Sequence, residues 1–313
     1  MFYILVNPAS GSGRGKKYWE QLEPLLKEEN ISYEVYFSEY PGHLFSQIRE
    51  ITQKEFSPHL IILGGDGTFN EALQCIEHFD RVTLSYIPTG SSNDLARDIG
   101  LKKDPVENMK HLLNEPQERK MDIGSVYYEN TQSAESVAEK RYFAVSCGIG
   151  FDAKVCKDVA VSKVKQTFNK FGLGKLVYLA IALKTLFQST PVSGKIMIPE
   201  VEKDIPITNL LFNVAMNHRY EGGGFKFTPD AKDNDGFLDL CLVSNVSRLK
   251  VLAVLPTAFS GNHVGVKGVD IYKTAAFSMK TEIPLCIHTD GEALADANFI
   301  SVECKANQIK FVY

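Results

Sequence analysis

The chain has 313 residues, of which 44% are hydrophobic and 23% are charged, and this composition excludes a largely disordered protein. Its length suggests two domains. The 34 basic and 38 acidic residues leave a net charge of −4, so no overall positive field favours nucleic acid. The six cysteines show no Cys-x-x-Cys spacing, which excludes a zinc ribbon and fits a reducing cytoplasm.

Strand-like and helix-like segments alternate through the first part of the chain. Short runs of β-branched and aromatic residues predict strands at Phe2–Val6, Ser32–Phe37, Leu60–Leu63 and Val82–Ile87. Apolar residues at helical spacing predict helices at Lys16–Glu28, His43–Gln53 and Thr68–His78. This alternation predicts a doubly wound α/β domain, a parallel sheet with helices on both faces. Ligands of such sheets bind beyond the carboxyl ends of the strands.

A glycine-rich loop, Asn7–Lys16, follows the first strand. A Walker A motif would need glycine in place of Ser10 and a hydroxyl residue in place of Lys17. A dinucleotide-binding fingerprint starting at Gly11 would need glycine in place of Lys16. The loop is therefore interpreted as a general phosphate cradle.

A second glycine loop, Gly64-Gly65-Asp66-Gly67-Thr68, lies between a buried-looking strand and an amphipathic helix. Its glycines allow backbone amides to approach an anion, and the helix N-terminus adds a favourable dipole. Asp66 would repel a bare phosphate, so we expect a divalent cation between them. The alternative is a tight strand-to-helix turn in which Asp66 caps the helix.

A third loop, Pro88–Asp94, follows the fourth strand. Its polar residues also fit the capping of a helix that begins at Leu95. Because all three loops come after strands of one parallel sheet, we expect them to converge on one ligand.

Beyond Asp122, strand-like runs dominate and predict an antiparallel β-sandwich or flattened barrel. We expect domains at residues 1–124 and 125–313, and the final strand is free to return to the first domain. The predicted strands are Tyr142–Ser146, Lys195–Ile198, Leu210–Ala215, Phe237–Val243, Val269–Phe277, Leu285–His288, Phe299–Val302 and Ile309–Tyr313.

One helical segment, about Val155 to Phe187, interrupts these strands. From Asp152 to Phe187 the chain holds seven lysines and two acidic residues, and leucines recur at helical spacing. A basic amphipathic helix can lie on an anionic bilayer. A helix packed on the core with a solvated lysine face is an equal alternative.

Together these motifs resemble the diacylglycerol kinase catalytic domain superfamily, above all its soluble bacterial lipid kinases, relatives of sphingosine and ceramide kinases. In the first domain the resemblance is carried by Asn7-Pro-x-Ser-Gly, Gly64-Gly-Asp-Gly-Thr-x-Asn-Glu71 and Pro88-x-Gly-x-x-Asn-Asp94. Later it is carried by Met121–Gly124, Pro229–Gly236 and Asp290-Gly-Glu292. The Gly-Gly-Asp-Gly core is shared with NAD kinases and phosphofructokinases, so the implied first domain is of that type.

The resemblance implies the following site residues. The ATP site would comprise Asn7, Pro8, Ala9, Ser10, Gly11, Ser38, Gly65, Asp66, Gly67, Thr68, Phe69, Asn70, Glu71 and Ser91. A carboxylate network that holds the catalytic magnesium would comprise Asp66, Asp94, Asp122, Asp235 and Asp290. Glu292 would be the general base, with Asp290 on the same strand face. A structural magnesium would be held by Asp235 and the backbone carbonyls of Lys232 and Phe237. Without the glycine loops, Asp290-Gly291-Glu292 would be interpreted as a plain hairpin turn.

The resemblance thus implies an ATP- and Mg²⁺-dependent lipid kinase, most simply one that converts diacylglycerol to phosphatidic acid. Alternatives are an NAD kinase-like enzyme and a nucleotide-binding regulatory protein without turnover. We expect a cytoplasmic protein, peripheral to the inner face of the membrane, that contacts its lipid substrate there and binds no nucleic acid. The sequence leaves the lipid and the oligomeric state open, a homodimer included.

Overall fold

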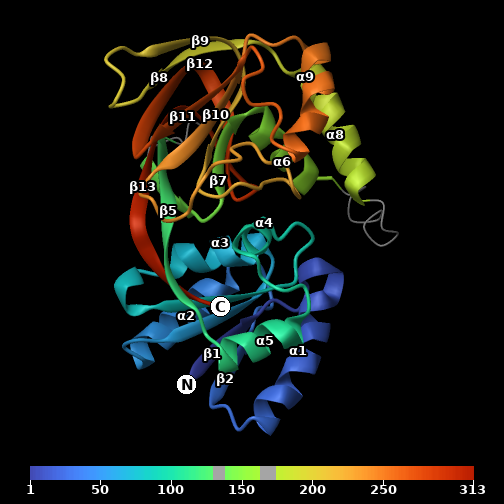
Figure 1. Ribbon diagram of the computed structural model, residues 1–313, viewed down its shortest axis with the longest axis vertical. Coiled ribbons are helices and arrows are strands. Elements are labelled where there is room, and N and C mark those ends of the chain that lie inside the picture. The colour runs from blue at the N-terminus through green and yellow to red at the C-terminus, as the bar shows by residue number, and fades with distance from the viewer. Residues whose placement is uncertain (130–137, 163–173) are drawn as a thin grey trace. The chain divides into compact units, whose positions relative to one another are not determined.

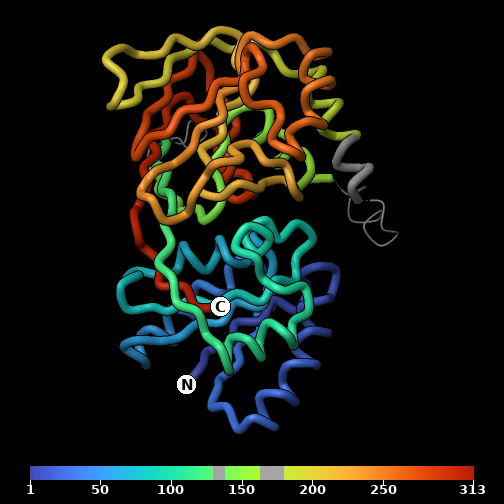
Figure 2. The backbone as a smooth tube through the Cα atoms, viewed as in Figure 1, coloured from blue at the N-terminus to red at the C-terminus, as the bar shows by residue number. Residues whose placement is uncertain are grey.

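The computed structural model describes residues 1–129, 138–162 and 174–313, which form two compact units (Figure 1). Unit 1 comprises Met1–Ile123 and Ala306–Tyr313, and unit 2 comprises Gly124–Lys305. The chain leaves unit 1 within strand β5 (Glu118–Glu129) and returns to it within β13 (Glu292–Val312), as Figure 2 shows.

Unit 1 is a parallel sheet in the order β13-β4-β3-β1-β2. Its elements are β1 (Phe2–Val6), α1 (Ser10–Glu28), β2 (Tyr33–Phe37), α2 (His43–Lys54), β3 (His59–Gly64), α3 (Asp66–Cys75), η1 (Phe79–Arg81), β4 (Thr83–Pro88), α4 (Asp94–Ile99) and α5 (Pro105–Asn114), followed by the start of β5 and closed by the end of β13.

Helices cover both faces of this sheet because its strands are apolar on both sides. Ile4 and Val6 of β1 pack against Trp19 and Leu22 of α1 in a cluster that α5 also joins. Leu5, which alternates with them along the strand, is fully buried toward the opposite face. There α2 and α3 pack on each other. The predicted doubly wound α/β domain is confirmed.

Unit 2 is a β-sandwich, as predicted. Its elements are the end of β5, β6 (Ala138–Phe143), β7 (Ser146–Gly150), α6 (Phe151–Ala160), α8 (Gly174–Gln188), β8 (Val192–Met197), β9 (Ile205–Met216), β10 (Leu238–Ser244), α9 (Arg248–Val254), η2 (Leu255–Phe259), β11 (Val269–Thr274), β12 (Ala276–Thr289) and the start of β13. The strands β11-β10-β9-β7-β12-β13 lie in that order, with β8 on β12 and β9, and β6 on β5.

The core of unit 2 is an apolar cluster to which most of its strands contribute alternate residues. Phe143 of β6, Ile149 of β7 and Leu240 of β10 are among its fully or almost fully buried members. All six cysteines are free thiols, and four of them, Cys75, Cys147, Cys241 and Cys286, are buried, so they serve as small apolar residues.

The predicted helical segment, about Val155 to Phe187, overlaps α6 and α8, and some of its lysines are already paired. Lys154 and Lys157 form ion pairs of 3.0 Å with Asp158 and Asp296, respectively. Lys163, Lys165 and Lys170 lie outside the described residues. Among the helices that the structure describes, none has the length and apolar character to cross a bilayer.

Candidate active site

The loop that follows β1, Asn7–Lys16, overlaps the first residues of α1 and is folded into a tight turn by its own side chains. Residues 11–13 have φ of +56°, +61° and +92°, in the left-handed region. Ser10 Oγ donates to the Asn7 carbonyl at 2.9 Å, and Asn7 Oδ1 accepts from the Ala9 N–H at 3.1 Å. The loop contains the first group of expected nucleotide ligands, Asn7, Pro8, Ala9, Ser10 and Gly11.

This loop contacts the loop that follows β4. A Cβ atom on Gly11 would lie 1.9 Å from the Thr89 carbonyl oxygen, so only glycine allows this approach. The hydroxyl groups of Ser10 and Thr89 are hydrogen-bonded. Arg14 Nη2 donates to the Gly90 carbonyl at 2.6 Å. The first and third predicted loops are therefore in direct contact.

The second loop, between β3 and α3, lies against both of the others. Asn7 Nδ2 donates to Thr68 Oγ1 at 3.0 Å. Gly65 and Gly90 approach so closely that a Cβ on Gly90 would be 2.8 Å from the Gly65 Cα. The structure thus brings the three predicted loops together at the carboxyl edge of the parallel sheet, where ligands of such sheets bind.

Two carboxylates lie at this edge. Asp66 Oδ2 accepts from the Asp94 N–H at 3.0 Å, and its Oδ1 accepts from the Tyr86 hydroxyl at 3.4 Å. Asp94 is almost fully buried, and its Oδ1 accepts from Arg97 at 3.1 Å. Burial and the charge of Asp66 raise the pKa of Tyr86, so its phenol stays a neutral donor. Carboxylate oxygens are the ligands that Mg²⁺ prefers, so Asp66 and Asp94 fit the expected metal.

Several residues of α3 expected at the nucleotide direct their side chains elsewhere. Phe69 and Asn70 are buried, and the Phe69 ring packs on Tyr86. Glu71 Oε1 accepts from the Leu44 N–H at 3.1 Å, near the start of α2. The Phe69 N–H donates to the Gly65 carbonyl at 3.0 Å, at the start of the helix. Gly67 and Thr68 lie in the first turn of this helix.

Three more of the predicted site residues lie in unit 1 and differ in their burial: Ser38, Ser91 and Asp122. Ser38 follows β2 and is half-buried, and Ser91 is exposed in the loop after β4. Asp122 is fully buried in β5, where its Oδ1 accepts from the Asn307 N–H of β13 at 2.6 Å. That contact joins the two strands that carry the chain between the units. A metal role for Asp122 stays a prediction.

In unit 2, Asp290 and Gly291 form the two-residue turn between β12 and β13. Their φ angles are +49° and +81°, and Thr289 pairs with Glu292 across the turn. The Asp290 carboxylate accepts from the backbone N–H groups of residues 144–146 at 2.8–2.9 Å. The expectation that Asp290 shares a strand face with Glu292 is wrong, because Asp290 belongs to the turn. Glu292 is exposed.

Asp235, the expected ligand of a structural magnesium, forms an ion pair with a lysine. Its Oδ2 lies 2.5 Å from Lys273 Nζ, and its Oδ1 accepts from the Phe237 N–H at 3.1 Å. The hydrogen bond that Lys273 donates to Asp235 raises the pKa of Lys273 and keeps it charged. Lys232 is exposed. The magnesium site at Lys232, Asp235 and Phe237 stays a prediction, and Lys273 would compete with the metal.

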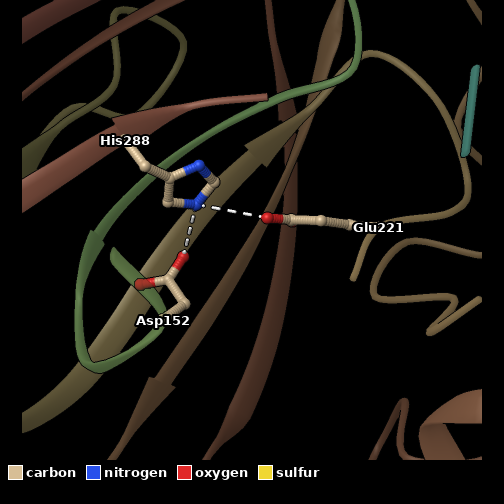
Figure 3. A group of neighbouring side chains, drawn as sticks. All are labelled: Asp152, Glu221 and His288. Atoms are coloured by element: carbon tan, nitrogen blue, oxygen red, sulfur yellow. Dashed lines mark hydrogen bonds and ion pairs between the residues drawn. The ribbon is translucent and has the colours of Figure 1, made fainter. Parts of the chain in front are cut away.

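Sequence reasoning missed a polar cluster in unit 2, formed by Asp152 of α6, Glu221 of the segment after β9 and His288 of β12. His288 Nε2 lies 3.0 Å from Asp152 Oδ2 and 3.2 Å from Glu221 Oε1 (Figure 3). A Cβ on Gly148 would be 1.9 Å from that Asp152 oxygen and 2.3 Å from Nε2. No sequence spacing connects these residues, because only the register of the strands and the path of the chain bring them together.

The protonation of this cluster follows from its neighbours. Burial lowers the pKa of His288, but the charges of Glu221 and Asp152 outweigh burial and raise it above its ordinary value. Because the Gly291 N–H donates to Nδ1 at 3.2 Å, the ring proton lies on Nε2, which faces the two carboxylates.

Comparison with known proteins agrees with this architecture. Residues 1–126 match the family model described as the diacylglycerol kinase catalytic domain. Residues 145–312, more than half of the chain, match the model described as the YegS C-terminal NAD kinase beta sandwich-like domain.

The curated relatives share most of the chain's length. Bacillus subtilis YtlR, a candidate lipid kinase by its name, is 28% identical over 95% of each chain. The diacylglycerol kinase of Bacillus subtilis is 28% identical over 92% of this chain and 88% of its own.

Two solved structures show the same fold. A diacylglycerol kinase structure from Bacillus anthracis aligns with a TM-score of 0.68 at 19% identity, over 100% of this chain and 96% of the other. A yeast NADH kinase aligns with a TM-score of 0.51 at 10% identity, over 100% and 82%.

Proposed function

The chain belongs to the kinase family that joins a diacylglycerol kinase catalytic domain to a YegS-type β-sandwich, and we propose that it is an ATP- and Mg²⁺-dependent lipid kinase. Its favoured acceptor is diacylglycerol, and the product is phosphatidic acid. The observation that carries this proposal is the convergence of three loops, one of which contains Asp66, at the carboxyl edge of the unit 1 sheet.

These loops supply what phosphoryl transfer needs from a protein, which is mainly positioning and charge neutralisation. Glycine residues at positions 11, 65 and 90 let the backbone approach closely, and Arg14 lies on the same loops. Asp66 and Asp94 would hold Mg²⁺, which when bound would neutralise charge on the phosphate oxygens. The side chain of Asn7 holds the first loop against Thr68.

The acceptor hydroxyl must lose a proton during transfer. Glu292 is exposed on unit 2, at the end of a turn that Asp290 holds through backbone amides. An exposed carboxylate on a rigid turn can take that proton as a general base. We therefore assign this role to Glu292 within the proposal.

Because lipid substrates reside in membranes, we also propose that the protein makes peripheral contact with the inner face of the cytoplasmic membrane. Lys154 and Lys157 are engaged by acidic partners, which leaves the membrane role to the other lysines of residues 152–187. Each lysine near an anionic surface contributes about 1 kcal/mol to binding.

The test uses radiolabelled ATP with diacylglycerol, a monoacylglycerol, a sphingoid base and a polyprenol in separate detergent micelles, and with NAD in solution. We expect labelled phosphatidic acid, no product after EDTA treatment, and recovery with added Mg²⁺. A labelled dinucleotide instead of a labelled lipid would overturn the acceptor assignment. If no acceptor becomes labelled although the protein binds ATP, that result would support a regulatory nucleotide-binding protein.

A further inference from the structure

The turn that carries Glu292 is held by a buried histidine. The Gly291 N–H donates to His288 Nδ1 at 3.2 Å, and His288 is fully buried in β12. We propose that His288 is a positioning residue that fixes the Asp290–Gly291 turn and thereby the direction of Glu292. This inference rests on the proposed function, because it is Glu292 as general base whose position matters.

The opposite edge of the ring is fixed by two carboxylates. Asp152 Oδ2 and Glu221 Oε1 lie 3.0 Å and 3.2 Å from His288 Nε2, so the Nε2–H has an acceptor on either side (Figure 3). Both carboxylates are largely buried, in parts of the chain distant in sequence from the turn. The ring is therefore held at both nitrogens, one by the carboxylates and one by the turn.

This hydrogen-bond pattern argues against a metal at the cluster. The donor atoms of Asp152, Glu221 and His288 lie within 4.8 Å of one another, a spacing that could suit a cation. A metal bound at Nε2 would need that nitrogen unprotonated, with the ring proton on Nδ1. Nδ1 instead accepts from the Gly291 N–H. The cluster is thus a support for the ring rather than a metal centre.

The space beside the ring is tightly limited on the side of β7. Gly148 of β7 pairs with His288 across the sheet, and a Cβ on Gly148 would be 2.3 Å from Nε2. Such a contact is too short for any side chain, so glycine is required beside the ring. With the ring confined, Nδ1 faces the turn in a fixed direction.

The other half of the turn is held independently. Asp290 has φ of +49°, a left-handed conformation that few non-glycine residues other than Asn and Asp adopt. Its carboxylate accepts from the N–H groups of residues 144–146. Asp290 holds the first turn residue and His288 holds the second, so loss of His288 would free Gly291 while the first anchor remains.

Two substitutions of His288 separate its two nitrogens. The side chain of Gln reaches about as far as Nε2, so His288→Gln keeps a donor for Asp152 and Glu221 and removes the acceptor for Gly291. The side chain of Asn reaches about as far as Nδ1, so His288→Asn keeps that acceptor. The control is His263→Gln, because His263 is also buried in unit 2 and its Nε2 bonds the Phe227 carbonyl at 2.9 Å.

Two readouts are measured on each variant that folds. The first is the exchange rate of the Gly291 amide hydrogen, and the second is kcat and the KM for ATP on the preferred lipid. We expect His288→Gln to exchange Gly291 at least about 10-fold faster and to lower kcat about 10- to 100-fold at constant KM. His263→Gln should stay within a few-fold of wild type in both, and His288→Asn should exchange Gly291 more slowly and lose less kcat than His288→Gln.

The outcomes separate this inference from the proposed function. Wild-type Gly291 exchange or wild-type kcat in His288→Gln would overturn the positioning role, as would an equal fall of kcat in both His288 variants. If His288→Asn does not fold, the His288→Gln and His263→Gln pair still decides the matter. A wild-type protein that phosphorylates no lipid would refute the proposed function, whereas an active wild type with an unimpaired His288→Gln would refute only the role of His288.

Discussion

Asp66 Oδ2 accepts a hydrogen bond of 3.0 Å from the backbone N–H of Asp94, and this contact joins the loop after β3 to the start of α4. Asp66 therefore has two properties that a substitution can separate: an acceptor for this N–H and a negative charge for a metal. The choice of variant decides which of the two is tested.

Asp66→Asn should abolish catalysis and keep the fold. The amide oxygen can still accept from the Asp94 N–H, but the neutral side chain attracts Mg²⁺ far less. We expect turnover to fall at least about 100-fold, with saturating Mg²⁺ giving no rescue. Asp66→Ala removes the acceptor too and should cost a further 0.5–2 kcal/mol or so of stability, about the worth of a helix cap.

Label transfer from ATP and thermal unfolding, measured on both variants, check this prediction. Near wild-type turnover of Asp66→Asn would show that the carboxylate has no part in holding the metal.

Gly11→Ala should abolish nucleotide binding, whereas Gly13→Ala should have a milder effect. Both residues have positive φ, so either substitution introduces backbone strain of about 1–2 kcal/mol. Only at Gly11 would the new Cβ also meet the Thr89 carbonyl, at 1.9 Å, and force the first and third loops apart. Calorimetric titration with ATP measures the difference, and equal affinity of the two variants would contradict the role of the loop contact.

Glu292→Gln should lower kcat about 10²–10⁴-fold, the usual contribution of a positioned general base. ATP affinity should hold, because the nucleotide loops lie in unit 1 and Glu292 lies in unit 2. The control is Glu282→Gln, which changes another exposed glutamate of unit 2 and should have no effect. Normal turnover of Glu292→Gln would place the base elsewhere, and a collapse of ATP binding would make the residue part of the nucleotide site.

His59 should make unit 1 less stable in mild acid. Burial, together with the nearby charge of Lys310, lowers the pKa of His59 from 6.5 to about 4. The unfolded chain therefore binds a proton at His59 more readily than the folded chain does. The contribution of neutral His59 to the free energy of unfolding is complete above about pH 6.5 and is lost as the pH falls toward 4. By pH 5 the loss should approach about 2 kcal/mol.

Urea unfolding at pH 8 and pH 5 measures this loss. The control is His59→Gln, which keeps a donor for the Ser85 hydroxyl, 2.8 Å from His59 Nε2, but does not titrate. An identical pH dependence in both proteins would contradict the prediction.

Changing Lys163, Lys165 and Lys170 together to Gln should weaken binding to anionic vesicles up to about 100-fold, at about 1 kcal/mol per lysine, and remove much of its salt dependence. Activity on a short-chain soluble lipid should hardly change. The control is Lys154→Gln with Lys157→Gln, since these lysines are already paired with acids. Equal loss of activity on both substrates would favour a structural helix.

Local patterns in the sequence were enough to predict four strands and three helices of the α/β half and the place of its loops, but not helix α5. Helical spacing of Leu22, Leu25 and Leu26 matches their burial on α1, and β1 begins and ends where its apolar run does. Periodicity and turn chemistry act over a few residues, so they can be read without the fold. The same locality concealed β5 (Glu118–Glu129), because its charged residues mask an otherwise buried strand.

Turn geometry in unit 2 shows where local patterns end. Val269–Phe277 was predicted as one strand, but the structure divides it into β11 and β12 around Ala275. Thr274 Oγ1 accepts from the Ala276 N–H at 3.2 Å, which holds this corner. A single apolar run carries no mark of such a side-chain contact.

Contacts between distant parts of the chain were decided by tertiary structure alone. The pairing of Lys310 with Thr83, which places β13 beside β4, depends on the order of strands in the sheet. The support of the Glu292 turn by His288, and of His288 by Asp152 and Glu221, depends on the register of β7 and β12 and on the path of the segment after β9. The sequence contains the residue types that these contacts need, but which of them meet is determined by sheet order and register, because residues far apart along the chain carry no shared local pattern.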